Sequence, residues 1–283
     1  MEKILIIGNS HSVDAFQLLS LAYKDQKPGE DVTLGILYYS GCSITRHIDF
    51  GKNKEAVCTY YKNTNGLWDI EKHVDMDRVL SDEPWEKVFF QAAKSDLDET
   101  LNRPGRRELE QMVDARVSAP HKFYWHTSWP SPNDPYFFAP DKTVPSGYQE
   151  RLIRLYGHDP VNQFTVLTSK AKEHILTDTV YEKAICTGAA IMNAHITQGR
   201  PQREIWRDYT HLCDFGRLIA AYALYTQLTG EKLENINIQA VPVPLRHKQY
   251  REEGELAITP EMKAIIIEAA NHALEDPWTV PQK

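Results

Sequence analysis

Short apolar runs alternate with amphipathic stretches along most of the chain. The first run, residues 4–7, is apolar at every position and stops at Gly8, after which apolar residues recur with helical spacing over residues 13–22. A run without polar positions is typical of a strand buried on both faces of a parallel sheet, and the change of period predicts a helix after it. The chain is therefore expected to begin with a strand, a sharp turn and a helix.

The same alternation continues toward the C-terminus. It predicts further strands at residues 32–39, 85–91, 122–127 and 183–186, and helices at 75–80, from about 105 to 113, and at 161–176, 215–228 and about 260–275. Asp214 and Thr259 are the expected N-caps of the last two helices, and Gly230 the residue that ends the first of them. Together these elements predict a repeated strand–helix unit.

Two segments break this rhythm. Over residues of about 55–72, strand-forming residues alternate with other residues on either side of Asn65-Gly66. This dipeptide between two such runs is the strongest short signal for a β-hairpin. Residues of about 129–160 are rich in proline and aromatic residues and predict a long loop, of the kind that is usually functional or mobile. We expect the first segment to form a small antiparallel insertion and the second to border the site.

The order of elements predicts an α/β fold with three layers, α/β/α. Its sheet is expected to be flavodoxin-like, mostly parallel and five-stranded, with the small β-hairpin insertion added, in a single domain spanning residues 1–283. Sheets of this kind bind ligands at the carboxyl ends of their strands. The site should therefore lie in the loops after the first four strands and before the helix at residue 215.

Composition and charge exclude several classes of partner. The 32 basic and 39 acidic residues give a net charge of 32 − 39 = −7 without a Lys/Arg run, which argues against nucleic acid. No stretch approaches the ~20 apolar residues of a membrane helix. The N-terminus shows no export signal, so a cytoplasmic protein is expected unless a leader has been removed. Four distant cysteines match neither zinc-ligand spacing nor a disulfide framework, and reduced thiols are the simpler interpretation.

Candidate chemistry begins at Gly8-Asn9-Ser10, directly after the first strand. Ser10 at this sheet edge suits a nucleophile, although Ser10 or Ser12 could equally cap the following helix. Asp208 and His211 stand three residues apart before the helix at 215. An imidazole activates a serine hydroxyl when a carboxylate holds its tautomer. Each motif is weak alone, but the two together predict a nucleophile, a base and an orienting acid.

These two motifs resemble the SGNH/GDSL hydrolase superfamily, and the likeness extends from Gly8 to about Tyr222. Within it, residues 40–43, Asn65-Gly66-x-Trp68 and Thr187-Gly188-x-Ala190 are similar to a poorly characterised bacterial branch. The resemblance implies a Ser-His-Asp triad of Ser10, His211 and Asp208. It also implies an oxyanion hole formed by the backbone N–H groups of Ser10 and Gly41.

One element departs from the superfamily's pattern. A Gly-x-Asn-Asp motif usually follows the third strand and supplies an asparagine to the oxyanion hole, whereas here the strand ends at Gln91 and no asparagine follows. Gln91 carries the same carboxamide on a longer stem, so it is either a substitute donor or a structural residue. Loss of one oxyanion donor typically costs about 10²–10³ in turnover, which is compatible with a weak or narrow esterase.

Substrate contacts are expected from side chains beside these loops. The candidates are His11, Trp125, His126 and Trp129, with core packing or a structural hydrogen bond as the alternative for each. Arg46 and His47 could bind an anionic group, with a solvated basic pair as the default. A metal site built from His11, His126, Asp208 and His211 is conceivable, but compact ligand spacing is missing, so neither a metal nor another cofactor is predicted.

The expected function is a serine esterase that acts on a small-molecule or carbohydrate ester, most simply an O-acetyl group on a carbohydrate, through an acyl-enzyme. An acyltransferase on the same scaffold is one alternative. A non-catalytic carbohydrate-binding relative is another, motivated by the missing asparagine. Fold resemblance alone does not separate these three functions.

Overall fold

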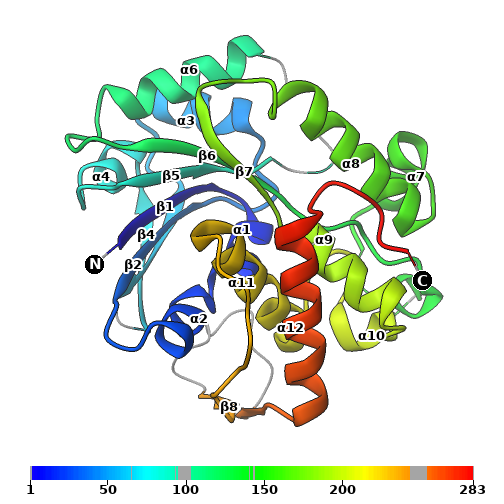
Figure 1. Ribbon diagram of the computed structural model, residues 1–283. Coiled ribbons are helices and arrows are strands. Elements are labelled where there is room, and N and C mark those ends of the chain that lie inside the picture. Colours follow the sequence, from blue (N-terminus) through cyan, green and yellow to red (C-terminus); the bar gives the residue numbers. More distant parts are fainter. Residues whose placement is uncertain are drawn as a thin grey trace.

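The central feature of the computed structural model is a seven-stranded sheet with the order β4-β3-β2-β1-β5-β6-β7 (Figure 1). The structure describes residues 2–64, 66–92, 94, 103–139, 141–142, 144–242 and 254–282. The strands are β1 (Glu2–Gly8), β2 (Val32–Tyr38), β3 (Cys58–Thr64), β4 (Leu67–Val74), β5 (Lys87–Phe90), β6 (Lys122–Thr127) and β7 (Tyr181–Cys186). A separate pair, β8 (Ala240–Val241) and β9 (Leu256–Ala257), lies outside this sheet.

The sheet confirms the predicted fold class. Strands β2, β1, β5, β6 and β7 pair in parallel in the flavodoxin-like order. The predicted hairpin forms β3 and β4, which extend this sheet because β3 pairs antiparallel with β2. At its turn Gly66 has φ +85°, and its N–H donates to the buried Asn63 side chain at 3.0 Å. Asn65, the other predicted turn residue, lies outside the described residues.

Helices cover both faces of the sheet. They are α1 (Ser10–Phe16), α2 (Leu19–Gln26), α3 (Ile44–Asn53), α4 (Met76–Leu80), α6 (Arg103–Asp114), α7 (Tyr148–Tyr156), α8 (Pro160–His174), α9 (Thr187–Met192), α10 (Gln202–Ile205), α11 (Asp214–Thr229) and α12 (Pro260–Glu275). A short 3-10 helix, η2 (Pro135–Phe138), and a short π-helix, η3 (Asn193–Thr197), complete the set of described helices. Helices α1, α2, α11 and α12 lie on one face, and α3, α4 and α6 on the other (Figure 1). The three layers are thus those that the sequence predicts.

Strand β1 separates two hydrophobic cores. Ile4 and Ile6 belong to the core under α11, and Leu5 and Ile7 to the core under α3 and α6, all four without exposed surface. This explains why the run has no polar position, because successive side chains of a strand point to opposite faces. The run therefore places the end of β1, where Ser10 follows, deep in the molecule.

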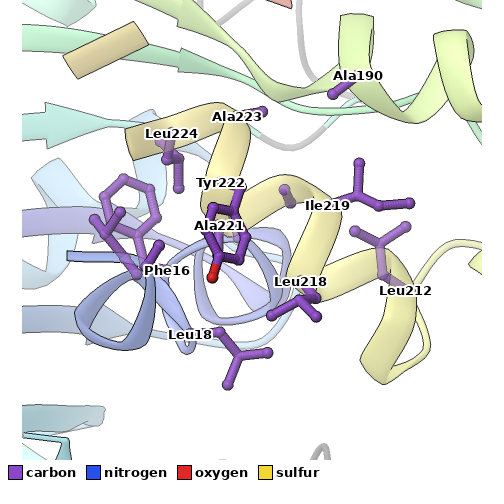
Figure 2. Close-up of a cluster of buried hydrophobic side chains, with 14 of the residues drawn as sticks. Phe16, Leu18, Ala190, Leu212, Leu218, Ile219, Ala221, Tyr222, Ala223 and Leu224 are labelled. Atoms are coloured by element: carbon purple, nitrogen blue, oxygen red, sulfur yellow. The ribbon is translucent and has the colours of Figure 1, made fainter. Parts of the chain in front are cut away.

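Helix α11 is the centre of the first core. Figure 2 shows side chains of α11, among them Leu218 and Tyr222, packed with Phe16 and Leu18. The helix is buried almost around its whole circumference because α12 covers the side that faces away from the sheet. Its N-terminus directly follows the segment that holds Asp208 and His211, so this packing fixes where that segment enters the site.

Several local predictions need correction. Asp214 is the first residue of α11 and not its N-cap, which is Cys213, because the Asp214 carboxylate accepts instead from Arg217 Nη1 at 2.5 Å. Gly230 ends α11 with φ +79°, and Thr259 caps α12, as predicted. The predicted loop at 129–160 contains the short helices η2 and α7. The two buried side chains of α7, Leu152 and Tyr156, stand four positions apart, as on one face of a helix, so the prediction of a continuous loop is wrong there.

Two further findings concern the described part of the chain. The four cysteines are all buried and form no disulfide bond there. Among the described helices, none combines the length and the apolar character that crossing a membrane requires.

The close approach at Gly8 gives a test of this packing. A Cβ at Gly8 would lie 2.1 Å from Ser12 Oγ and 2.9 Å from Gln91 Oε1. We expect Gly8→Ala to lower the free energy of unfolding by about 1–3 kcal/mol, because overpacking displaces these two buried side chains. Urea unfolding measures the loss, and adding Ser12→Ala should restore part of it. A Gly8→Ala protein as stable as the parent would contradict the packing described here.

Candidate active site

Asn9 begins the site by capping α1, a role that the sequence had left between Ser10 and Ser12. The Asn9 side chain accepts from the His11 N–H at 3.1 Å. Ser10 is therefore the first residue of the helix, half-buried, with its hydroxyl available for other contacts. The turn presents Ser10 at the carboxyl end of β1, which is the predicted edge of the sheet.

Ser10, His211 and Asp208 meet in one hydrogen-bonded row. His211 Nε2 lies 2.8 Å from Ser10 Oγ, across 201 positions of sequence. His211 Nδ1 lies 2.9 Å and 3.0 Å from the two carboxylate oxygens of Asp208. A proton on Nδ1 donates to this carboxylate, which leaves Nε2 free to accept the proton of the serine hydroxyl. The three predicted residues thus have the geometry of a nucleophile, a base and an orienting acid.

Asp208 is held as an anion. Its Oδ1 also accepts the backbone N–H groups of Thr210 at 2.9 Å and His211 at 2.8 Å. Burial alone would raise the pKa of Asp208, but these bonds and the His211 ring outweigh it and lower the pKa to about 2. The carboxylate therefore stays charged at neutral pH, where it stabilises a protonated His211 ring.

A buried ion pair joins the helix that carries Ser10 to the segment that carries Asp208 and His211. Asp14, one turn after Ser10 on α1, accepts from Arg217 Nε of α11 at 3.0 Å and from the Leu212 N–H at 2.9 Å. Arg207 Nη1 contacts the same carboxylate at 3.2 Å and donates to the Leu212 carbonyl at 2.6 Å. Arg207 and Leu212 bracket Asp208 and His211, so Asp14 fixes that segment against the helix that carries Ser10.

The charge of Asp14 depends on these arginines. Asp14 and Arg217 have no exposed surface. Burial would raise the pKa of Asp14, whereas Arg217, Arg207 and the Leu212 N–H lower it, and the balance is a lowered pKa. Our sequence interpretation missed this residue. The available signal was an acidic side chain within the apolar stripe of the helix after Ser10, a position that requires a buried partner.

On the other side of Ser10, Asn9 ties the loop that contains Gly41 to the turn after β1. Asn9 Nδ2 donates to the Cys42 carbonyl at 3.2 Å. Gly41 is exposed and has φ +60°, a conformation that favours glycine. The structure thus brings the two predicted backbone donors of the oxyanion hole, Ser10 and Gly41, into adjacent loops.

Gln91 has a structural position. It is fully buried, and its Oε1 accepts from the Asn9 N–H at 3.3 Å and from Ser12 Oγ at 2.9 Å. Its Nε2 donates to the carbonyl of Ala92. The carboxamide therefore braces the turn that presents Ser10. Of the two alternatives for Gln91, these contacts favour the structural residue over the substitute oxyanion donor.

His11 and Trp129 lie behind the row of Ser10, His211 and Asp208, where both contact Thr210. His11 is 5% exposed, its Nε2 lies 3.0 Å from Thr210 Oγ1, and its ring centroid lies 5.9 Å from that of His211. Trp129 is fully buried and donates from Nε1 to the Thr210 carbonyl at 2.9 Å. Both hold Thr210, which lies between Asp208 and His211. They adjoin the site as predicted, but as supports rather than as an exposed binding surface.

Trp125 and His126 belong to the core, contrary to their predicted substrate contact. Trp125 is 3% exposed and packs edge-on against Tyr181. His126 is 1% exposed, its Nε2 lies 2.9 Å from Thr187 Oγ1, and burial lowers its pKa to about 3. The reason is that α8 and α9 close over this end of the sheet, which a strand pattern does not reveal.

The basic pair after the glycine loop is likewise not a free anion site. His47 is fully buried with Nε2 3.0 Å from the Gly8 carbonyl, and burial lowers its pKa to about 4. The guanidinium of Arg46 stacks over the Tyr39 ring at 4.7 Å. As for metals, no three His, Cys, Asp or Glu side chains gather in a metal-binding arrangement within the described residues.

Comparison with known proteins identifies a family and supports the fold. Residues 3–251 match the model of the family DUF4886, described as a domain of unknown function. The chain superposes on a DUF4886 family protein from Bacteroides uniformis ATCC 8492 with a TM-score of 0.77 and 23% identity, covering 99% of this chain and 97% of that one. None of the curated proteins compared matches the sequence.

Two more distant structures share part of the architecture. One is a proposed SGNH hydrolase from Slackia heliotrinireducens, with a TM-score of 0.42 and 14% identity over 78% of this chain and 95% of that chain. The other is a proposed arylesterase from Agrobacterium tumefaciens str. C58, with a TM-score of 0.43 and 14% identity over 81% and 99%. At such TM-scores neither likeness carries an argument about activity.

The buried ion pair of Asp14 and Arg217 predicts that a small substitution has a large effect on the free energy of unfolding. Asp14→Asn keeps the side-chain size but removes the charge that faces Arg217. We expect a loss of about 3 kcal/mol in the free energy of unfolding, at the low end for a broken buried ion pair, because Asp214 still contacts Arg217. Asp69→Asn on the exposed surface of β4 is the control and should cost little.

The same substitution has a defined pH dependence. Because the folded-state pKa of Asp14 is lowered, its contribution is fully present above the unfolded pKa of about 3.9 and is lost as the pH falls through the folded value. Urea unfolding at pH 7 and below pH 3 should therefore show the difference between parent and Asp14→Asn shrinking on acidification. A difference that is absent at pH 7 would contradict the role of this bridge.

The two possible roles of Gln91, support of the turn before Ser10 and donation to the oxyanion, predict different effects of its removal. If it braces the turn, Gln91→Ala leaves the Asn9 N–H and Ser12 without their acceptor, and stability should fall by about 1–3 kcal/mol. Urea unfolding gives this value, and Gln111→Ala in α6 serves as a control outside the site. An unchanged stability combined with a turnover reduced by about 10²–10³ would instead identify an oxyanion donor.

Proposed function

Because the chain belongs to the DUF4886 family, whose description leaves its activity open, we propose its function from the geometry at Ser10: a serine esterase that acts through an acyl-enzyme. The single observation that carries this proposal is the row of contacts from Ser10 Oγ to His211 and from His211 to Asp208. Such a row makes a serine hydroxyl nucleophilic at neutral pH.

The proposed reaction begins at the ester carbonyl. His211 Nε2 takes the Ser10 hydroxyl proton while Oγ bonds to the carbonyl carbon, and the carbonyl electron pair moves onto oxygen. The imidazolium formed is stabilised by Asp208, whose low pKa keeps it ionised. The backbone N–H groups of Ser10 and Gly41 are the proposed donors to the oxyanion, a preference supported by the Asn9 bond that joins their two loops.

The tetrahedral intermediate then collapses and releases the alcohol. Its electron pair re-forms the carbonyl, the bond to the alcohol oxygen breaks, and His211 Nε2 returns the proton to the departing alcohol. In the second half, His211 takes a proton from water, whose oxygen attacks the acyl carbon. Collapse of this second intermediate releases the acid and gives the proton back to Ser10 Oγ.

The proposed substrate is a small-molecule or carbohydrate ester, with an O-acetyl group on a carbohydrate as the first to test. The buried positions of Trp125 and Trp129 remove aromatic stacking at these residues as an argument for sugar binding. An aromatic residue that does reach the surface nearby is Tyr136, 43% exposed, with Arg203 over its ring at 4.4 Å. The carbohydrate part of the proposal therefore rests on the resemblance, and the esterase part on the triad.

Hydrolysis of 4-nitrophenyl acetate tests the esterase proposal. Ser10→Ala, His211→Ala and Asp208→Asn should each lower kcat by about 10⁴-fold or more, because each removes one member of a row that acts as a unit. Ser81→Ala and His158→Ala change the same residue types at exposed positions and should retain the parent rate. Folded Ser10→Ala protein with the parent rate would reject the proposal.

A further inference from the structure

A buried lysine stands beside this site. Lys94, four residues after β5 ends, is 3% exposed, and its Nζ donates to Ser131 Oγ at 2.9 Å. Among the described residues, no carboxylate lies within ion-pair distance of this ammonium group. Burial of an unpaired charge is strongly unfavourable, so stability alone does not explain a lysine at this position.

A row of hydroxyl groups connects Lys94 with the triad. The Tyr148 hydroxyl lies between Ser131 and Thr210, 3.1 Å from Thr210 Oγ1. Thr210 Oγ1 in turn meets His11 Nε2 at 3.0 Å, and the Thr210 N–H donates to Asp208. The ammonium group is therefore linked through two side chains to the loop that carries the catalytic base.

The described groups that face Lys94 include one carboxylate, and that carboxylate is already hydrogen-bonded elsewhere. Among the described residues, the acidic group that acts on Lys94 is Asp208, and its oxygens are already occupied by His211 and two backbone N–H groups. His11 faces the same region as a neutral ring, because burial and then the charge of Lys94 hold its pKa well below the usual value. The remaining neighbours, Ser131 and Tyr148, are neutral hydroxyls that can donate to an anion.

We propose that Lys94, with the hydroxyls of Ser131 and Tyr148, binds a carboxylate carried by the substrate, so that the site selects esters with a negatively charged group. This inference rests on the proposed esterase function and names its substrate class. Of the three N–H groups of Lys94, one donates to Ser131, and the other two have no acceptor among the described residues. A carboxylate fits one ammonium group, whereas a phosphate dianion is more often bound by several cations.

The burial of Lys94 determines how such a site would respond to pH. Desolvation lowers the pKa of Lys94 to about 7, although Asp208 opposes the shift. A bound carboxylate stabilises the protonated form, so binding near pH 7.5 should take up a proton. Within a site that excludes water, the resulting charge pair is stronger than it would be on the surface.

Two pairs of esters test the selection. One pair is 3-carboxyphenyl acetate and its methyl ester, which place the charge on the alcohol side. The other is mono(4-nitrophenyl) adipate and its methyl ester, which place it on the acyl side. We expect the parent enzyme to favour the charged member of one pair in kcat/KM. Lys94→Met should lower that ratio by about 10- to 100-fold, the size of one hydrogen bond to a charged group.

The control variants distinguish an effect of the Lys94 charge from an effect on folding. Lys94→Arg retains the charge and should keep part of the ratio, while Lys72→Met, at an exposed position of β4, should leave it unchanged. Lys94→Met removes a buried ammonium group, so its stability should be at least that of the parent below pH 7. No preference for the charged ester in the parent, or the same ratio in Lys94→Met, would overturn the proposal.

Direct binding distinguishes failure of this inference from failure of the esterase proposal. If the parent protein hydrolyses neither neutral ester, the esterase proposal fails, and the subsite is judged by calorimetry with 3-hydroxybenzoate and adipate. Parent and Ser10→Ala protein should bind one of these anions with proton uptake in two buffers, and Lys94→Met should bind it at least tenfold more weakly. Equal binding by Lys94→Met, or no binding by the parent, would reject the subsite.

Discussion

The contact between Asp14 and Arg217 is the interaction on which the arrangement of the site depends. It joins α1, which begins with Ser10, to α11, which begins just after His211, and both charged groups have no exposed surface. A buried pair of this kind contributes little net stability compared with an apolar pair, but it is very unfavourable to break. It therefore acts mainly as a constraint on position. Through Leu212 and Arg207, the same carboxylate also holds the segment that contains Asp208 and His211.

The residues of the site differ in how deeply they are buried. Ser10, His211 and Asp208 are half-buried, and behind them lie residues that are fully or almost fully buried: Gln91 under the turn, and His11 and Trp129 behind Thr210. Their hydrogen bonds fix the backbone that presents Ser10 and His211. Preorganisation of this type reduces the reorganisation needed when charge develops on the carbonyl oxygen. Lys94 is almost fully buried too, and it differs from the supporting residues because its side chain is an ammonium group, which contacts no carboxylate among the described residues.

The sequence predicted those features that depend on local pattern. The uninterrupted apolar run of β1 indicated a doubly covered strand, and the flavodoxin-like order followed from the repeated units. Ser10, His211 and Asp208 could be placed because each lies at an element boundary. Trp125 and His126 were misplaced because a strand pattern does not show which helices close over its end. Asp14 meets Leu212 across 198 positions and Arg217 of α11 across 203, and Lys94 meets Ser131 across 37, so only the folded chain brings these partners together.

The central claim is that Ser10 is a nucleophile activated by His211, and covalent labelling tests it most directly. A fluorophosphonate reacts with an activated serine by losing fluoride and forming a phosphonyl ester on Oγ, which intact-mass spectrometry detects without knowledge of the natural substrate. The account predicts one label per chain, mapped to the peptide that contains Ser10, and none on Ser10→Ala or His211→Ala protein. Absence of label on the folded parent protein, or the same labelling of Ser10→Ala, would contradict it.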